Sequence, residues 1–278
     1  MKIVVTGTRG IPGIQGGVET HCQELYPLIA DEQHEIIVIR RPNYAVERSV
    51  QIYKQVAIKD ISAPRSKHLE AFVHTFKAVI YARKVKADIV HIHAVGPALM
   101  TPVARLLGMK VVITHHGPDY DRDKWGRFAK WILCMGERAG VYYANHIIVI
   151  SEHIRQIIYH QYSAKRNVTL IHNGVNVPTR VIGTEYLESL DLTEYGYVLA
   201  VGRFVKEKNL DQLVEAFTQL SSPSMKLVIA GDADFQDEYA QKLKEVCWKQ
   251  KNICLTGFIK GDKLAQLYTY AKVFVLPS

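Results

Sequence analysis

The feature of this sequence that most constrains its fold is a series of short, uninterrupted runs of valine, isoleucine and leucine. These runs are KIVVTG, HEIIVIR, ADIVHIH, KVVITHH, HIIVIS, VTLIHN, GYVLAVG, MKLVIAG, NICLTG and KVFVLPS. Because they are continuous rather than alternating with polar residues, they are typical of strands that are covered on both faces. Segments of helical period separate them, and alternating strands and helices predict an α/β protein with doubly wound parallel sheets.

Apolar stripes at helical spacing lie between several of these runs. The residues that form them are Val18, Cys22, Leu25 and Ile29, then Leu69, Phe72, Val73, Phe76, Val79 and Ile80, and finally Trp125, Phe128, Ile132, Met135 and Ala139. We expect each stripe to face a sheet, and we expect Pro27 to bend or loosen the first helix.

The alternation of strands and helices is interrupted once, at residues 177–196. The segment VPTRVIGTEYLESLDLTEYG contains a proline, a glycine and scattered charge but no strong apolar period. We interpret it as a linker between two Rossmann-like domains, at residues 1–178 and 179–278. The second domain shows only four evident strands, and the chain stops directly after the last of them, so we expect this domain to be incomplete.

The composition narrows the class of protein. A length of 278 residues leaves room for two domains, and a hydrophobic content of 48% is that of a globular protein with a full-sized core. The net charge of +8 suits an anionic partner such as a nucleotide phosphate, but no nucleic-acid-binding module is recognisable. No apolar run approaches the length of a membrane span. Because the sequence opens on a predicted core strand, we expect no separate signal peptide. The four cysteines form no CxxC pair, so we expect buried thiols in a reduced, cytoplasmic protein.

The loop after the first strand, TGTRGIPGIQGGVET, has two competing explanations. Its first part fits the glycine spacing of a dinucleotide-binding turn, which would indicate an NAD(P)-dependent sugar-nucleotide epimerase or dehydrogenase. That fingerprint needs an acidic residue at the end of the second strand, where this sequence has Arg40-Arg41, suited at best to a 2′-phosphate. Such an enzyme also needs a Tyr-x-x-x-Lys pair on a helix. Here the pair occurs at Tyr120/Lys124, in a loop, and at Tyr268/Lys272, which runs into a strand, so neither context is right. The loop is also too long for the fingerprint, which disfavours this alternative.

The second part of the loop favours a different ligand. Gly16-Gly17 lets the backbone approach a ligand closely, and the helix that follows offers unpaired N–H groups and the positive end of its dipole. Glu19 lies in the first turn of that helix, where it either compensates the dipole or belongs to a site. Farther along, GRFVKEKNL places Arg203 and Lys208 in a loop after a strand, where two cations either hold a diphosphate or are simply hydrated.

Together these stretches resemble the retaining glycosyltransferases of family 4, which have the GT-B fold. GTRGIPGIQGGVETHCQELYP is similar to the amino-terminal domain of bacterial rhamnosyltransferase-like enzymes of surface-polysaccharide biosynthesis. VVITHHG, LIHNGV, GRFVKEK, VIAGDA, LTGFI and VFVLPS follow in the family's order over essentially the whole chain. The resemblance implies an acceptor-side domain at residues 1–178 and a nucleotide-sugar-binding domain at residues 179–278.

The resemblance also assigns roles to individual residues. His116 matches the family histidine that faces the transferred sugar, and the neighbouring His115 is our candidate for a structural role. Arg203 and Lys208 match the pair that grips the donor diphosphate. The other positions implied in substrate binding are Gly16, Gly17 and Glu19 at the donor diphosphate or the acceptor, Asn173 and Gly174 beside the cleft, and Gly257, Phe258 and Ile259 at the nucleotide base.

These roles imply transfer of a hexosyl or deoxyhexosyl group from a nucleoside-diphosphate sugar to a saccharide or lipid-linked saccharide, with retention of configuration. Cations and helix termini would stabilise the leaving diphosphate, so we expect no cofactor and no metal ion. DxD pairs occur at Asp121/Asp123 and Asp232/Asp234, and we interpret both as chance matches rather than metal ligands.

The sequence departs from the family at its end. The family places a Glu-x7-Glu segment, which contacts the donor sugar and the ribose, directly after the Pro-Ser found here at residues 277–278. We therefore expect a truncated product, and a non-catalytic, truncated transferase stays open as an alternative function.

Basic side chains beside aromatic residues indicate one further partner. One predicted helix carries Lys67, His68, Lys77, Arg83 and Lys84, and another carries Lys124, Arg127 and Lys130 beside Trp125 and Trp131. Such faces suit peripheral contact with the inner leaflet of the membrane. An ordinary helix with a hydrated basic face is the simpler explanation, and both stay open.

Overall fold

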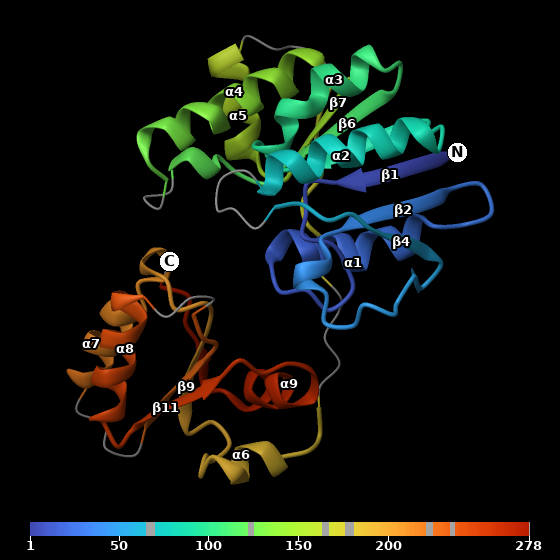
Figure 1. The fold of residues 1–278 in the computed structure, drawn as a ribbon. Helices are drawn as coiled ribbons and strands as arrows, with labels where there is room; N and C mark the ends of the chain where they lie inside the picture. Colours follow the sequence, from blue (N-terminus) through green and yellow to red (C-terminus); the bar gives the residue numbers. More distant parts are fainter. Residues whose placement is uncertain are drawn as a thin grey trace. The chain divides into compact units, whose positions relative to one another are not determined.

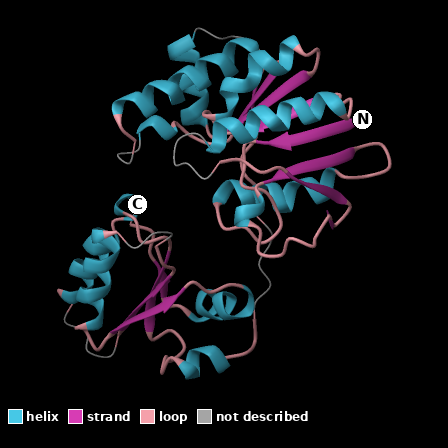
Figure 2. Cartoon of the chain, in the orientation of Figure 1, coloured by secondary structure: helices cyan, strands magenta, loops and turns pink. Residues whose placement is uncertain are grey.

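The chain divides into two compact units, Met1–Val175 and Asn176–Ser278 (Figure 1). The structure is a computed structural model that describes residues 1–64, 70–121, 125–162, 167–175, 181–220, 225–233 and 237–277. The boundary predicted between residues 178 and 179 falls at 176–180, outside the described residues. Each unit contains one sheet with helices packed on both of its faces (Figure 2).

The sheet of the first unit has the strand order β3-β4-β2-β1-β5-β6-β7-β8, and its neighbouring strands are parallel except for the β3–β4 pair. The predicted apolar runs form β1, β2 and β5 to β8. Strands β3 and β4 were not predicted; they form a short antiparallel pair in which apolar and polar residues are mixed. The strand bounds are β1 Lys2–Thr6, β2 Glu35–Arg40, β3 Ile52–Tyr53, β4 Val56–Asp60, β5 Ile89–His93, β6 Lys110–His115, β7 His146–Val149 and β8 Val168–Leu170.

Helices cover both faces of this sheet. On one face, Cys22 and Tyr26 of α1 pack against Val5 of β1. On the opposite face, Ala78 of α2 packs against Val4, as expected when neighbouring strand residues point to opposite faces. The bounds are α1 Gly17–Ile29, α2 Glu70–Lys84, α3 Thr101–Leu106, α4 Arg127–Tyr143 and α5 Glu152–Tyr162, with 3₁₀ turns η1 Pro42–Tyr44, η2 Pro97–Met100 and η3 Asp119–Asp121. Helix α1 continues through Pro27.

Helix α4 packs through two glycines that were not part of its predicted apolar stripe, together with Ala139, which was. A Cβ added to Gly136 would lie 2.2 Å from the carbonyl oxygen of Val95, and one added to Gly140 would lie 2.7 Å from Cδ1 of Ile113. The helix therefore lies very close to its neighbours along this face. Phe128 and Met135, predicted to face the core, are exposed instead, and the prediction of a single apolar stripe was wrong for them.

The second unit has a parallel sheet with the strand order β11-β10-β9-β12. Leu210 of α7 and Leu243 of α8 pack on one face, and Leu187 of α6 and Leu267 of α9 pack on the other. The bounds are α6 Glu185–Ser189, β9 Tyr197–Val201, η4 Lys206–Lys208, α7 Leu210–Thr218, β10 Lys226–Ala230, α8 Glu238–Trp248, β11 Ile253–Gly257, α9 Gly261–Tyr270 and β12 Val273–Phe274.

Much of the predicted linker belongs to the core of the second unit. Leu187 is only 1% exposed, and Leu192 is also buried. The backbone N–H of Tyr186 donates a hydrogen bond of 2.9 Å to the side chain of Gln266 in α9. The linker interpretation is therefore wrong for residues 185–192, because α6 is too short for its apolar residues to form a recognisable period.

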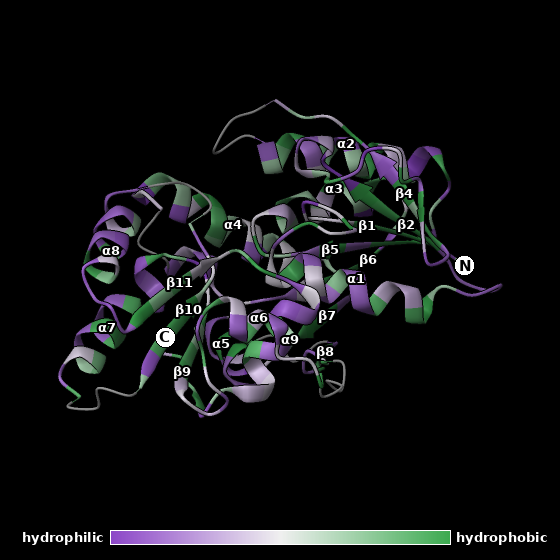
Figure 3. Ribbon diagram, turned by 90° about the horizontal axis from the view of Figure 1, so that it is seen from below, coloured by the Kyte–Doolittle hydropathy of each residue, from purple (hydrophilic) through white to green (hydrophobic). Residues whose placement is uncertain are grey.

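The distribution of hydropathy follows these cores. The central strands of both units are coloured hydrophobic in Figure 3, whereas the helices mix both classes of residue. Within the described residues, no helix combines the length and the apolar character needed to cross a bilayer. Cys22 and Cys247 are buried thiols as expected, but Cys134 is exposed on α4, contrary to expectation.

Candidate active site

The loop that follows β1 packs against the end of β5. Gly7 has a φ of +93°, and a Cβ at this position would lie 2.1 Å from the carbonyl oxygen of His93. Glycine therefore allows the loop to cross the end of the neighbouring strand. The loop ends at Gly16, and α1 begins at Gly17, so that the start of α1 lies at the carboxyl edge of the sheet.

Glu19, in the first turn of α1, forms a hydrogen bond with the backbone of this loop. Its buried carboxylate accepts a hydrogen bond of 3.0 Å from the backbone N–H of Arg9. Oε2 of Glu19 lies 1.9 Å from where a Cβ on Gly16 would be, and Gly16 has a φ of +149°. The carboxylate also lies at the positive end of the helix dipole. These contacts support the structural explanation of Glu19, and its contact with a substrate stays a prediction.

Gly17 differs from Gly16 in its surroundings. No atom of the described residues lies within 4 Å of a Cβ added to Gly17. The backbone of this residue is therefore open to the approach of a ligand, whereas Gly16 is already in contact with Glu19.

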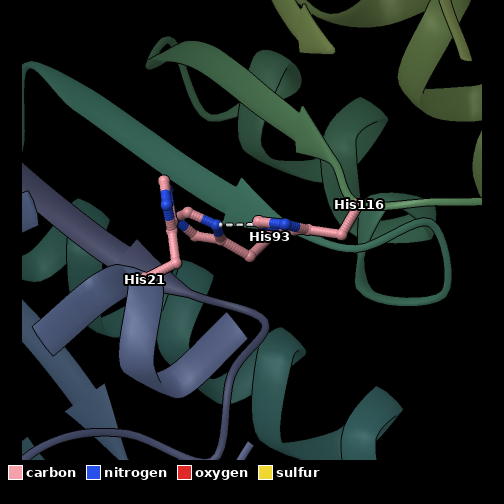
Figure 4. A group of neighbouring side chains, drawn as sticks. All are labelled: His21, His93 and His116. Atoms are coloured by element: carbon pink, nitrogen blue, oxygen red, sulfur yellow. Dashed lines mark hydrogen bonds between the residues drawn. The ribbon is translucent and has the colours of Figure 1, made fainter. Parts of the chain in front are cut away.

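His116 follows β6 and meets two further histidines, His93 and His21 (Figure 4). Nε2 of His116 is 2.9 Å from Nδ1 of His93, the last residue of β5, and the two rings stack. The ring of His21, in α1, stands edge-on to both, with its centroid 5.3 Å from that of His116 and 5.8 Å from that of His93. Three imidazoles from three separate elements thus come together beside the loop that contains Gly16 and Gly17.

A chain of hydrogen bonds continues from His93 into the core. The hydroxyl of Tyr26 lies 2.6 Å from Nε2 of His93 and 2.9 Å from Nδ1 of His91. Nε2 of His91 lies 2.7 Å from Oγ1 of Thr114. All four of these side chains are buried, and His116 forms the outer end. We call Thr114, His91, Tyr26, His93 and His116 the histidine chain.

The histidine chain is neutral at physiological pH. Burial, followed by repulsion from neighbouring histidines, lowers the pKa of His91 to about 3 and the pKa of His116 to about 3. The same two causes hold the pKa of His93 well below 6.5. Burial also raises the pKa of Tyr26 well above 10, so its hydroxyl keeps its proton.

Neutrality couples the tautomers of the histidine chain. Each neutral imidazole carries one N–H, and the Tyr26 hydroxyl has one proton to donate. If Tyr26 donates to His91, then His93 donates to Tyr26 through its Nε2. In that case Nε2 of His116 donates to His93, and Nδ1 of His116 is unprotonated. If every bond is reversed, Nδ1 of His116 carries the proton. The buried chain therefore decides whether Nδ1 of His116 accepts or donates a hydrogen bond.

His115 has a separate environment. Its Nε2 donates a hydrogen bond of 2.7 Å to Oε1 of Glu137 in α4, and both side chains are buried. Tyr162 and Tyr120 donate to the same carboxylate. Burial alone would raise the pKa of Glu137, but the hydrogen bonds from His115 and Tyr162 outweigh it and hold this pKa below 4.5. His115 therefore connects β6 to α4, which agrees with the structural role expected for it.

In the second unit, the predicted donor-binding residues lie at the carboxyl edge of the sheet. Arg203 and Lys208 belong to the loop between β9 and α7, and the side chain of Lys208 passes over Gly202, with its Cγ and Cδ 3.8 Å from a Cβ built there. Gly257 ends β11, and Phe258 and Ile259 follow it.

Backbone hydrogen bonds connect the loops of this edge. The N–H of Gly202 donates to Ala230 at the end of β10, and the N–H of Gly231 donates to Gly257. Gly231 has a φ of +136°, and a Cβ there would lie 2.0 Å from the carbonyl oxygen of Gly202. The loops after β9, β10 and β11 thus form one continuous surface that contains both predicted cations.

Asn173 and Gly174 lie elsewhere in the first unit. They follow β8, the edge strand, which is separated from β6 by β7. Both are exposed. Within the first unit, the structure therefore groups Gly16, Gly17, Glu19 and His116 and leaves Asn173 and Gly174 outside that group.

The structure argues against the dinucleotide alternative. The side chain of Arg40 is only 1% exposed, and its guanidinium donates to both carboxylate oxygens of Asp60 at 2.7 and 3.0 Å. It is therefore already paired and does not present itself to a 2′-phosphate. Tyr268 lies on α9, but Lys272 lies beyond the end of that helix, and Lys124 falls outside the described residues.

Four residues of the network around His116 were not predicted from the sequence, namely His21, His91, His93 and Tyr26. The signal that could have found two of them is the alternation HIH at the end of the run ADIVHIH. Residues two apart on a strand share a face, so this pattern places two imidazoles side by side at a carboxyl edge. No comparable local signal indicates Tyr26 or His21, which reach these imidazoles from another part of the chain.

Comparison with known proteins gives two family matches. The model of Glycosyltransferase Family 4 matches residues 15–178, and that of Glycosyl transferases group 1 matches residues 185–278. An uncharacterised glycosyltransferase from Methanocaldococcus jannaschii is 26% identical over 307 residues, which cover 100% of this chain and 75% of the relative.

Two further proteins are similar to this chain. The N-acetylgalactosamine-N,N′-diacetylbacillosaminyl-diphospho-undecaprenol 4-α-N-acetylgalactosaminyltransferase of Campylobacter jejuni is 30% identical over 109 residues, 38% of this chain and 28% of the relative. The crystal structure of Anabaena HepE in complex with UDP-glucose has a TM-score of 0.74 at 16% identity, covering 99% of this chain and 73% of that one.

The two Rossmann-like units place the protein in the GT-B class of folds, as predicted. Within that class, the chain belongs to glycosyltransferase family 4 and is a transferase.

The two adjacent glycines of the opening loop give a matched test of this geometry. Gly16→Ala should lower the free energy of unfolding by about 1–3 kcal/mol, because it strains the backbone at positive φ and displaces the Glu19 carboxylate. Gly17→Ala should change it by less than about 0.5 kcal/mol, because the new methyl group meets no atom. Urea denaturation of both variants measures the difference, and equal losses would contradict the described loop.

Proposed function

We propose that this chain transfers a hexosyl or deoxyhexosyl group from a nucleoside-diphosphate sugar to a saccharide or lipid-linked saccharide acceptor, in the biosynthesis of a bacterial surface polysaccharide. The observation that carries the proposal is the continuous loop surface of the second unit, where Arg203 and Lys208 lie at the carboxyl edge of a parallel sheet. Ligands of doubly wound sheets bind at this edge. The similarity to HepE, solved with UDP-glucose, supports a nucleotide-sugar donor.

The donor diphosphate is assigned to the loop between β9 and α7. The guanidinium of Arg203 and the ammonium of Lys208 form charge-assisted hydrogen bonds with phosphate oxygens. Asn209 precedes α7 and makes no side-chain capping bond, and the N–H of Asp211 donates to the hydroxyl of Tyr239 at 3.4 Å, so this helix contributes the positive end of its dipole to the site. The loop after β11, which β10 separates from β9 in the sheet, is assigned to the nucleotide base through Gly257, Phe258 and Ile259.

In the proposed chemistry, negative charge develops on the leaving diphosphate while positive charge develops on the sugar. The leaving diphosphate gains negative charge as the glycosidic bond breaks, and the two cations stabilise that charge. The sugar carbon gains oxocarbenium character, which a neutral His116 does not repel. We assign His116 to a hydrogen bond with the transferred sugar through Nδ1. Retention of configuration by attack from the front face is part of the proposal.

The proposed transfer requires no metal ion. Asp232, the first residue of one DxD pair, accepts a contact of 2.7 Å from the ammonium of Lys244, so a cation of the protein already neutralises it. Its partner Asp234 lies outside the described residues, as does Asp123 of the other pair. The cations of the β9–α7 loop supply the charge that a metal ion supplies in other transferases.

Binding of the donor nucleotide tests the proposed function. Calorimetric titration with UDP, GDP and dTDP in the presence of EDTA should show binding of one of them. Arg203→Ala should weaken this binding at least tenfold, because a charged hydrogen-bond donor contributes about 1.5–3 kcal/mol. Lys206→Ala is the matched control, because Lys206 is an exposed cation of the same loop, and it should bind as the unmodified chain does.

Two outcomes of this titration would contradict the proposed function. One is binding of NAD(P) without binding of any nucleoside diphosphate. The other is diphosphate binding that is lost on adding EDTA, which would show that a metal ion is required.

We also propose peripheral contact with the inner leaflet of the membrane, through the first turns of α4. Phe128 and Trp131 are 73% and 59% exposed, and their rings stack with centroids 6.0 Å apart. Arg127 and Lys130 lie beside them on the same helix. Aromatic rings that are flanked by cations suit the interface of an anionic bilayer. A lipid-linked acceptor, as in the name of the Campylobacter relative, would be reached from that position on the cytoplasmic side.

Vesicle binding tests this contact. Replacing Phe128 and Trp131 together by serine should reduce cosedimentation with vesicles of phosphatidylglycerol and phosphatidylcholine by at least tenfold, because about 0.8 kcal/mol is lost for each buried methylene equivalent. Trp248→Ser is the control, because Trp248 is equally exposed but lies on α8. Unchanged binding of the double variant, or equal loss in the control, would contradict the proposal.

A further inference from the structure

Three histidines of the first unit form a cluster with the composition of a transition-metal site. One ring nitrogen from each of His21, His93 and His116 lies within 4.8 Å of the other two. They come from α1, from the end of β5 and from the residue after β6 (Figure 4). Two of the three positions are therefore fixed by strands that neighbour each other in the sheet.

The nitrogens of His93 and His116 have nearly the separation that a metal ion requires. Zinc–nitrogen bonds of 2.0–2.1 Å in a tetrahedral site place two ligand nitrogens about 3.3 Å apart. Nδ1 of His93 and Nε2 of His116 are 2.9 Å apart, where they share one proton. Binding of one ion by all three residues would need a small opening of this pair and a rotation of the half-buried His21 ring toward it.

The surroundings of His93 complete the arrangement. Histidines that bind metal ions usually donate their other N–H to a fixed acceptor, which orients the ring. Nε2 of His93 lies 2.6 Å from the Tyr26 hydroxyl, which lies 2.9 Å from Nδ1 of His91. With its proton on Nε2, His93 donates to Tyr26, Tyr26 donates to His91, and Nδ1 of His93 is left free to bind an ion.

We propose that His21, His93 and His116 bind a divalent transition-metal ion, with Zn²⁺ as the expected occupant. The cluster consists of imidazoles, which suit Zn²⁺ and its neighbours, whereas Mg²⁺ and Ca²⁺ prefer oxygen ligands. Binding needs no proton release, because each imidazole keeps its single N–H on the nitrogen that faces away from the ion. Three protein ligands leave a fourth coordination position for water.

The bound ion inhibits sugar transfer. This consequence alone rests on the proposed function, in which His116 faces the transferred sugar. An ion on Nε2 of His116 replaces the hydrogen bond from His93 and occupies the space beside the ring. This inhibitory role is distinct from that of a catalytic metal centre, because the proposed transfer itself requires no metal ion.

Metal titration of the purified full chain, with any polyhistidine tag removed, tests the site. Addition of Co²⁺ should give the visible absorption of a four-coordinate ion at one equivalent, and Zn²⁺ should displace it. His21→Ala and His116→Ala should each weaken binding at least tenfold. Tyr26→Phe keeps the ring but removes the outer hydrogen bond of His93, and it should weaken binding by about 10–100-fold.

His153→Ala and His160→Ala are the controls, because both histidines are exposed on α5 and lie outside the cluster. They should bind one equivalent with unchanged affinity. Absence of Co²⁺ binding at micromolar concentrations, or binding that the cluster variants leave unchanged, would overturn the proposal.

The effect on transfer is measured separately from the metal site. If nucleoside diphosphates do not bind but the Co²⁺ spectrum is obtained, the proposed function fails and the metal site stands. If transfer is measured and Zn²⁺ at saturating occupancy leaves its rate unchanged, the inhibitory role is overturned.

Discussion

The hydroxyl group of Tyr26 is the interaction on which the candidate site of the first unit depends. It connects α1 to His91 and His93 of β5, and His93 in turn contacts His116 beyond β6. A buried polar network of this kind is rigid when every member is satisfied and costly when one partner is lost. This network therefore fixes α1, which begins at Gly17, relative to the ends of β5 and β6, where His93 and His116 lie.

Much of the fold could be predicted from the sequence, because strands buried on both faces require continuous apolar runs. The predictions failed for elements that pack against the core without a long apolar run or a regular apolar stripe. Helix α4 packs through Gly136 and Gly140, whose lack of a side chain permits close approach but gives no hydrophobic signal. The segment around Leu187 was mistaken for a linker because its helix, α6, has only 5 residues, too few to show an apolar period. The pair β3–β4 was missed because only part of it faces the core.

The candidate site could be predicted only in part. Glycines at positive φ and cations after strands leave local patterns, which is why Gly16 and Arg203 were identified from the sequence. The histidine chain leaves almost none, because its contacts join residues 23 to 67 positions apart, such as His93 with His116 and Tyr26 with His93. Only the topology of a parallel sheet, in which β1 lies beside β5, brings these side chains together.

Folding holds His91, His93 and His116 neutral in one hydrogen-bonded chain. Their folded pKa values lie below the ordinary value of about 6.5, so the unfolded state binds more protons as the pH falls. Their contribution to stability is thus complete above pH 6.5 and is lost as the pH falls toward about 3. An NMR titration of ¹⁵N-histidine-labelled protein in EDTA measures the protonation state of these rings. We predict neutral ring-nitrogen shifts for His116 from about pH 7.5 to about pH 5, and protonation of His116 with a midpoint near 6.5 would contradict the account.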